Sequence, residues 1–339
     1  TIYFLTCISI FSPVSMRLFR KRLDLESLDD FELASKEVPC HSNWSYDRSA
    51  PNGPYCWHTI GYTDCNGLEQ SPINIETDNV CYSYFKPLYD DVSKGLHGNL
   101  SNSGHDPKFS VATTDVSYNL YKVPSRPNKT FRLKQFHMHF HEEEGNGSEH
   151  MINCKGYDGE LHFVHHENEL PACIPITHEN VVVLAIFVKK GGKTFKSLQP
   201  FFQNLKYVQQ CGSHINLTLS PLTFLKNLGD LYTYKGSLTN PDCSEGAIWL
   251  IKRKPISVSE DDFQMLKWLM WDNHTHIIEH GNVRPTFPLN ARRVLANFKA
   301  PKGDNKCDYD NNYNSDKTGH ECTKWYNKSQ CGNYLWGLR

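Results

Sequence analysis

The chain has 339 residues, of which 39% are hydrophobic and 12% aromatic, so it contains enough apolar side chains for a sizeable core. Its 36 Lys and Arg residues nearly balance 37 Asp and Glu residues, for a formal net charge of −1. This balance argues against a nucleic-acid binder, which carries a basic excess, and against a polyanion that acts on mineral by charge alone. The length allows two ordinary domains or one large β domain.

The chain begins with an apolar run over 2–11, followed by the basic stretch Arg17–Arg22. The run is too short for a membrane span and is typical of a signal-peptide core, although a buried strand is the alternative. We therefore predict a signal peptide over 1–16, with its true start missing because position 1 is not Met, and a leader over 17–40. No later stretch is apolar for long enough to predict a membrane span.

Cysteines and glycosylation sequons predict export. The 12 cysteines include no CxxC pair, which favours disulfides in an oxidising compartment over a zinc ribbon. Removal of Cys7 with the signal peptide leaves an odd number, so one thiol is free or links two chains in an oligomer. Seven N-x-S/T sequons suggest a secreted glycoprotein; they begin at Asn43, Asn99, Asn128, Asn146, Asn216, Asn273 and Asn327.

The chain from 41 to 299 has the uniform pattern of one domain, mostly β with short helices. Short apolar or alternating runs predict strands over Ser110–Val116, Thr130–Phe140, Glu160–Val164, Val181–Lys189, Leu231–Tyr234 and Ala247–Lys252. Two stretches favour helices, Ser197–Val208 and Ser259–Trp271, and the second begins with a Ser cap. Residues 300–339 form a polar tail with three cysteines.

The most informative segment is Gln135–Phe140, because side chains alternate faces along a strand. His137 and His139 therefore share one face. His162 follows after a gap long enough for a loop and a returning strand, which would bring it beside the pair. Three neutral imidazoles with an open fourth position describe a catalytic zinc site.

Other interpretations of these histidines stay open from the residues alone. A His-x-His pair on a strand is more often structural or exposed. His141 offers a rival pairing with His139, and the segment partly matches a cupin metal motif with Glu143 as the carboxylate. The further Gly that the cupin motif expects is replaced by His150. The sequence contains no HExxH motif, which argues against a zincin protease.

The chain resembles an α-class carbonic anhydrase over about residues 44–298. Its matching segments run in order: Trp44–Tyr46, Gly53–Pro54, Trp57, Gln70–Ile75, Asn102–His105, Gln135–His139, Gly147–His150, Glu160–Val164, Val183–Phe187, Tyr234–Pro241, Lys254–Val258 and Asn282–Pro285. The resemblance implies a large, twisted, mainly antiparallel central sheet with short peripheral helices. It also implies reversible hydration of CO2 to bicarbonate by hydroxide bound to Zn²⁺.

The resemblance assigns roles to individual residues. His137, His139 and His162 match the zinc ligands. In the resemblance, the free ring N–H groups of His137, His139 and His162 donate hydrogen bonds to Gln135, to the backbone carbonyl of Asn282 and to Glu160, respectively. These bonds fix the orientation of the rings. Thr239 matches the hydroxyl that orients the zinc-bound hydroxide, and Glu149 matches the carboxylate that accepts the hydrogen bond from Thr239. The CO2 pocket is matched by Val164, Val183, Leu238 and Trp249.

The remaining implied roles concern proton transfer and the loop beside the site. His105 matches the proton shuttle, because a His with a pKa near 6.5 can take up and release a proton at neutral pH. Tyr46 matches a residue that orders the water chain. Cys65 and Cys243 match a disulfide of extracellular members, which would clamp the loop that carries Thr239.

The chain departs from the family pattern near the site. Phe140 replaces a common Trp, and Asp106–Lys108 is interpreted as an insertion that would displace His105. Ser103, Asn240 and Asp242 are further replacements near the water network and the disulfide, but all three zinc ligands are kept.

The extra cysteines, the sequons and the polar tail resemble nacrein-like proteins of mollusc shell matrix, although no Gly/Asn-rich repeat is present. This resemblance implies partners such as shell-matrix components or calcium carbonate. The alternative function is a matrix or mineral-binding protein that uses the anhydrase fold with weak or no catalysis. Calcium binding by the tail is a further expectation, without an EF-hand loop to support it.

Overall fold

The computed structural model describes residues 43–115, 117–168, 180–272 and 275–299. The predicted signal peptide (1–16), leader (17–40) and tail (300–339) lie outside these residues, as do the sequons at Asn273 and Asn327. Within the described ranges, no helix is long and apolar enough to cross a membrane.

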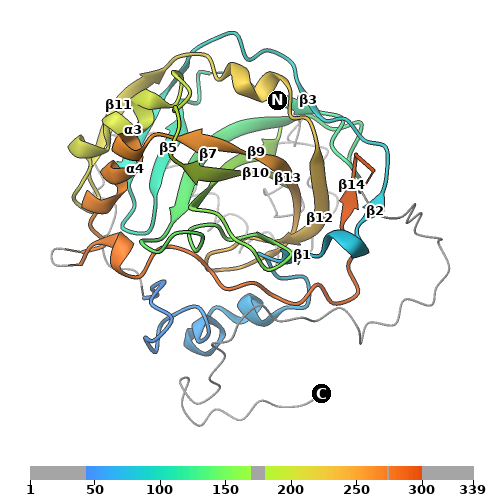
Figure 1. Ribbon diagram of the computed structural model, residues 1–339, viewed down its shortest axis with the longest axis horizontal. Helices are drawn as coiled ribbons and strands as arrows, with labels where there is room; N and C mark the ends of the chain where they lie inside the picture. The colour runs from blue at the N-terminus through green and yellow to red at the C-terminus, as the bar shows by residue number, and fades with distance from the viewer. Residues whose placement is uncertain (1–42, 116, 169–179, 273–274, 300–339) are drawn as a thin grey trace, which may run out of the picture.

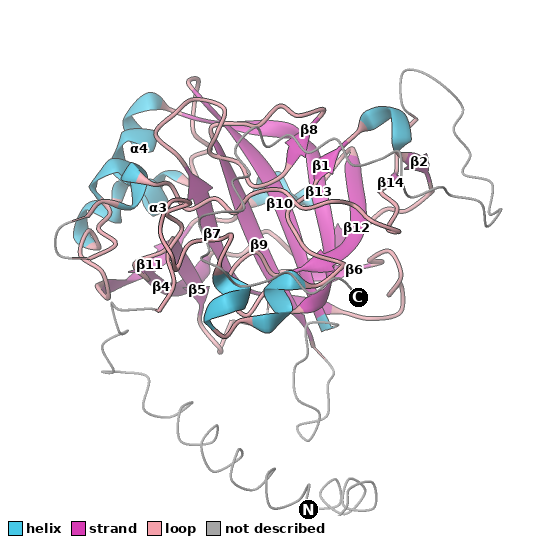
Figure 2. Cartoon of the chain, turned by 90° about the horizontal axis from the view of Figure 1, so that it is seen from below, coloured by secondary structure: helices cyan, strands magenta, loops and turns pink. Residues whose placement is uncertain are grey.

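One large twisted sheet of 12 strands crosses the domain (Figures 1 and 2). Its strands are β2 (Cys81–Tyr82), β3 (Leu88–Tyr89), β4 (Leu96–Asn102), β5 (Pro107–Val111), β6 (Asn119–Tyr121), β7 (Phe131–Phe140), β9 (Gly159–Glu167), β10 (Val181–Lys190), β11 (His214–Leu219), β12 (Leu231–Ser237), β13 (Glu245–Val258) and β14 (Leu295–Ala296). The main order is β11-β4-β5-β7-β9-β10-β13-β12-β14-β2, and β3 and β6 pair beside β7. Two pairs, β10–β13 and β14–β2, are parallel, and the other pairs of this sheet are antiparallel. The expected mostly β fold with a mainly antiparallel sheet is confirmed.

The central strands are buried on both faces, which explains their continuous apolar runs. Along β10, Val182 and Leu184 belong to the larger core cluster, whereas Val183 and Ala185 belong to a second cluster on the opposite face. The sheet therefore separates two cores, and the second of these contains the predicted pocket residue Trp249.

Strand β7 shows the alternation that the sequence predicts. Phe136, Met138 and Phe140 are fully buried in the larger core. The intervening residues face the opposite side of the sheet. This arrangement anchors the strand by its apolar face and presents its histidines on the other.

The helices are shorter than predicted. The segment Ser197–Val208 contains α3 (Gln199–Gln203) and the 3₁₀ turn η6 (Leu205–Tyr207), and α4 (Glu260–Gln264) passes into η8 (Met265–Trp268). Ser259 caps α4 as predicted, because its side chain accepts a hydrogen bond from the Asp262 N–H. Both helices pack at one end of the sheet (Figure 1). The other short elements are η2 (Trp57–Ile60), η3 (Thr63–Asn66), η4 (Thr77–Asn79), η7 (Thr223–Lys226), η9 (Ile277–Glu279) and the separate parallel pair β1 (Asn74–Ile75) and β8 (Met151–Ile152).

Two expectations around β5 are wrong. The predicted strand Ser110–Val116 is shifted, because β5 ends at Val111 and a turn follows, in which the Asp115 N–H donates to the Ala112 carbonyl. Asp106–Lys108 is not an inserted loop, since Pro107 and Lys108 are the first residues of β5 and pair with β4. His105 therefore occupies a tight connection between two adjacent strands.

Candidate metal centre and active site

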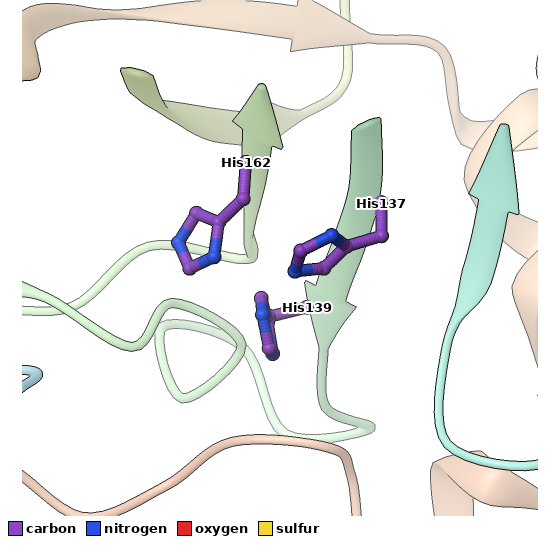
Figure 3. A group of neighbouring side chains, drawn as sticks. All are labelled: His137, His139 and His162. Carbon is purple, nitrogen blue, oxygen red and sulfur yellow. The ribbon is translucent and has the colours of Figure 1, made fainter. Parts of the chain in front are cut away.

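Three histidines meet on one face of the central sheet. His137 and His139 extend from β7 and His162 from β9, and the three rings point toward one another (Figure 3). His137 and His162 are direct partners in the β7–β9 register. One nitrogen atom of each ring lies within 4.8 Å of the corresponding atoms of the other two.

The second nitrogen of each ring is hydrogen-bonded to an oxygen that can only accept. The acceptors for His137, His139 and His162 are Gln135 Oε1 at 2.9 Å, the Asn282 carbonyl oxygen at 2.6 Å and Glu160 Oε1 at 2.7 Å. A neutral imidazole has one N–H, so each bond leaves a lone pair on the other nitrogen, directed into the shared space. The buried Nε2 of His139 has no hydrogen-bond partner.

Burial lowers the pKa of all three histidines, for His139 to about 3. The rings are therefore neutral near pH 7, the state in which imidazole binds a metal ion. The site therefore offers three neutral nitrogen donors with fixed tautomers, and one of them, His139 Nε2, has no hydrogen-bond partner. This donor set fits a tetrahedral zinc ion with an open fourth position.

A cavity of about 400 Å³ opens beside the histidines. Its wall includes the four residues that the resemblance assigns to the CO2 pocket, which are Val164, Val183, Leu238 and Trp249. They come from β9, β10, the loop after β12, and β13. Thr239 and Asn240 line the same cavity. An uncharged substrate thus has an apolar wall on one side and the histidines on the other.

Glu149 lies fully buried behind Thr239. Its Oε1 accepts the Arg284 backbone N–H at 3.0 Å, and its Oε2 lies 3.4 Å from His139 Nε2. Burial raises the pKa of the Glu149 carboxyl, whereas hydrogen bonds from Thr239 and from the Arg284 backbone act in the opposite direction. These donors hold the carboxylate in one orientation toward the Thr239 hydroxyl.

The loop that carries Thr239 is held by Arg284 and by a disulfide. The fully buried Arg284 guanidinium donates to the carbonyl oxygen of Leu238, next to Thr239, at 3.4 Å, and to those of Ser71 at 2.8 Å and Cys65 at 3.2 Å. Cys65 is bonded to Cys243, the pairing that the resemblance implies. Four further described cysteines are also disulfide-bonded: Cys56, Cys81, Cys154 and Cys211. The described part of the chain contains no free cysteine.

The sequence interpretation missed a buried network behind the zinc-ligand candidates. His150 Nδ1 donates to Glu160 Oε1 at 2.7 Å, so this oxygen accepts from His150 and His162 together. The Tyr234 hydroxyl lies 2.8 Å from His150 Nε2 and 2.6 Å from Ser71 Oγ. Burial opposes ionisation of Glu160, but the two histidines hold its pKa well below the usual value. The only sequence signal for His150 was its place in the Gly147–His150 match.

His105 is partly exposed and stacks on the Trp44 indole. Its ring lies parallel to Trp44 with centroids 3.7 Å apart, and the ring centroid of Tyr46 is 6.0 Å from that of His105 and 6.4 Å from that of His139. Burial lowers the pKa of His105 to about 4. The Asn282 side chain donates to the His105 carbonyl oxygen and to the Met138 carbonyl oxygen, each at 2.9 Å, and so joins the His105 loop to β7.

The rival histidine interpretations do not match the structure. His141 is outside the group, and its Nδ1 accepts the Glu143 N–H at 3.0 Å, two residues further along the same loop. Among the described residues, Glu143 is in neither of the two clusters that could hold a metal ion. Strand β7 ends at Phe140, so the alternation that would align His141 with His139 does not continue.

The fold thus presents, on one face of a β-sheet, three histidines that could hold a metal ion, and the comparisons give the family. Residues 52–298 match the model of the eukaryotic-type carbonic anhydrase. The chain is 29% identical to human "Carbonic anhydrase 7" over 269 residues, which cover 77% of this chain and 99% of that protein. It is 30% identical to "Carbonic anhydrase 1" of Monodelphis domestica over 265 residues, covering 76% and 98%. The chain belongs to the eukaryotic-type carbonic anhydrase family, and the expectation of a carbonate dehydratase is confirmed.

Proposed function

We propose that the chain hydrates CO2 reversibly to bicarbonate at a zinc ion held by His137, His139 and His162. The observation that carries the proposal is the convergence of one nitrogen from each of the three rings. The other nitrogen of each ring is hydrogen-bonded to an oxygen acceptor, which fixes the tautomer. A zinc ion bound there would supply positive charge that makes water a nucleophile near neutral pH.

The protein groups around the centre have separate tasks in this proposal. Thr239 accepts a hydrogen bond from the nucleophile and donates its own hydroxyl hydrogen to Glu149, so that a lone pair of the nucleophile points toward the substrate. The apolar wall with Val164 and Leu238 receives uncharged CO2. Gln135, Glu160 and Asn282 keep the three rings in the metal-binding tautomer.

Proton export is the step for which this site is least favourable. His105 is the candidate carrier, and Tyr46 orders water between it and the centre. In the stacked position, however, burial lowers the pKa of His105 to about 4. A group with this pKa is almost wholly unprotonated at pH 7, so it carries a proton only in a small fraction of turnovers. We therefore expect proton export to limit kcat.

Stopped-flow CO2 hydration on metal-analysed protein tests this function. The zinc-loaded protein should be active and inhibited by a sulfonamide, and added imidazole buffer should raise kcat because it replaces the inefficient carrier. His105→Ala should lower kcat only slightly in the absence of imidazole. Zinc-replete protein that leaves hydration at the buffer rate would contradict the proposed reaction. A large loss in His105→Ala would instead show that His105 leaves the stacked position.

We also propose that the protein is secreted and acts in an extracellular matrix of the nacrein-like kind, where bicarbonate supports calcium carbonate deposition. The Cys65–Cys243 disulfide and the four other bonded cysteines support an oxidising compartment. Three sequon asparagines, Asn43, Asn128 and Asn146, are exposed in turns or loops.

Expression of the full chain in a eukaryotic secretory host tests the proposed setting. The protein should be recovered from the medium, lose mass on treatment with an N-glycosidase and bind calcium carbonate. A version without 300–339 should lose mineral binding and keep its hydration activity, which also serves as the folding control. Retention of the full chain inside the cell, or equal mineral binding by both versions, would contradict this part of the proposal.

A further inference from the structure

The cavity beside the three histidines is also lined by a histidine that none of the roles described above uses. His166 of β9 lines the same cavity of about 400 Å³ as His137 and His162. Apart from those two, it is the one side chain among the described lining residues that titrates near neutral pH. An imidazole in this position can exchange protons with water in the cavity.

Strand alternation turns His166 toward the cavity. His162, Val164 and His166 are every second residue of β9, so they face the same side of the sheet, and all three line the cavity. The rise per residue puts the His166 backbone about 13 Å along the strand from that of His162. His162 is buried, whereas His166 is half-buried. The strand thus places one imidazole at the inner end of the cavity and another toward its outer end.

The preceding residue shows the contrast with the other face of the sheet. His165 is fully buried, and its Nε2 lies 2.8 Å from the Tyr89 hydroxyl. Burial lowers its pKa to about 3, so it stays neutral near pH 7. Of these two adjacent histidines, His166 is therefore the one that is placed to exchange protons with solvent.

The candidate carrier His105 lines a different and much smaller cavity. That cavity has a volume of about 20 Å³, includes Tyr46 in its wall, and shares none of its described lining residues with the larger one. A space of this size holds about one water molecule, whereas the larger cavity has room for a chain of several. The larger cavity therefore offers a water route from the centre, and this route leads to His166.

In the described part of the chain, the charged residues beside His166 on this face come from β7. Arg132 is its direct partner in the β7–β9 ladder, and Lys134 is the exposed extra residue of the β7 bulge next to that pair. Its partner on β10 is the apolar Val181. Glu167, the next residue of β9, faces the other side of the sheet and is already ion-paired. The two positive charges disfavour a charged imidazole, so a proton bound by His166 is passed on readily.

We propose that His166 is a proton carrier of this enzyme, which takes the proton released by CO2 hydration from water in the cavity and passes it to a base in solution. The inference rests on the proposed zinc-dependent function. Hydration of one CO2 gives one bicarbonate and one proton. The proton binds the neutral ring nitrogen of His166 to give an imidazolium, and its transfer to a buffer base or to water restores the neutral ring.

Stopped-flow hydration by the full chain in weak buffer tests the inference. His166→Gln keeps a polar side chain of similar size that does not titrate. It should lower kcat about tenfold, less than the roughly 100-fold effect of a lost acid–base group, because His105 and water remain as carriers. The value of kcat/KM for CO2 should stay unchanged, because it reports the steps before the proton leaves. Imidazole buffer should restore kcat to that of wild type in the same buffer.

NMR of the histidine rings gives a readout that does not depend on activity. The spectrum of His166→Gln identifies the wild-type His166 signal by its absence. That signal should shift with pH between about 5 and 8 in the zinc-free and in the zinc-loaded protein, because an imidazole in contact with water titrates in this range. Zinc stoichiometry and melting temperature identify a variant that fails to fold, in which case His166→Ala replaces it.

A matched control is present on β4. His97 is an exposed strand histidine whose Nδ1 lies 3.0 Å from Thr218 Oγ1, and it is not among the described residues that line either cavity. His97→Gln removes the same titratable group and should keep the wild-type kcat in weak buffer.

The outcomes separate this inference from the proposed function. A folded, zinc-loaded His166→Gln with the wild-type kcat, or with equal losses in kcat and kcat/KM that imidazole does not restore, would overturn the role of His166 and leave the zinc centre intact. An equal loss of kcat in His97→Gln, or a wild-type His166 signal that does not move between about pH 5 and 8, would also overturn it. Zinc-replete wild type that leaves hydration at the buffer rate would overturn the proposed function and the inference together.

Discussion

Replacement of His139 by alanine should abolish stoichiometric zinc binding and reduce CO2 hydration to the buffer rate. His139 supplies a buried Nε2 that has no hydrogen-bond partner, and its Nδ1 is fixed by the Asn282 carbonyl. Two remaining imidazoles do not complete the ligand set of a catalytic zinc ion. The loss should exceed the roughly 10- to 100-fold that changes beyond the metal ligands cause. Metal analysis and stopped-flow hydration on the same sample measure both effects.

The matched control is His141→Ala, two residues further along the chain. This residue lies beyond the end of β7 and contacts the Glu143 backbone. Its removal should leave the zinc content at one ion per chain and hydration within about twofold of wild type. Loss of zinc in His141→Ala together with retention in His139→Ala would restore the rival pairing and contradict the centre described here.

The second large effect is expected at Thr239. Thr239→Ala should lower kcat/KM for CO2 about 100-fold while the zinc content stays unchanged, because the nucleophile loses the hydroxyl that orients it. Thr239→Ser keeps the hydroxyl and should recover most of the activity. This pair separates an orienting role from simple packing, since both variants shorten the side chain.

Glu149→Gln extends the test to the next residue of the chain of hydrogen bonds. The amide keeps an oxygen for the Arg284 backbone N–H but lacks the negative charge that favours the Thr239 donor. We expect a loss similar to that of Thr239→Ala and little further loss in the double variant, because the two residues act as a unit. Fully additive losses would contradict their coupling.

Much of the fold follows from local patterns in the sequence. The alternation over Gln135–Phe140 and the continuous apolar run over Val181–Val188 each lie in one long strand. Ser259 marks the start of α4 correctly. Helix lengths were overestimated, because the α-helical turns of 199–203 and 260–264 pass into 3₁₀ turns that a periodicity argument does not distinguish from α-helix.

Strand boundaries near the site depended on pairing instead of local pattern. Asp106–Lys108 contains a Pro and two charges, which favour a loop in isolation. In the fold, Pro107 pairs with Asn102 and Lys108 with His137. The ladder with β4 and β7 thus overrides the local preference, and the same register brings Lys108 beside His137.

The sequence by itself determined which side chains face together along each strand, because the two-residue period of a β-strand is local. It placed His137 and His139 on one face and predicted that a returning strand brings His162 beside them, and the family resemblance added Thr239 and Glu149. Only the tertiary structure decided which strands are neighbours, since register depends on contacts between residues far apart in the chain. The tertiary structure excluded His141, joined His150 to the buried network through Glu160, and placed Lys108 beside His137.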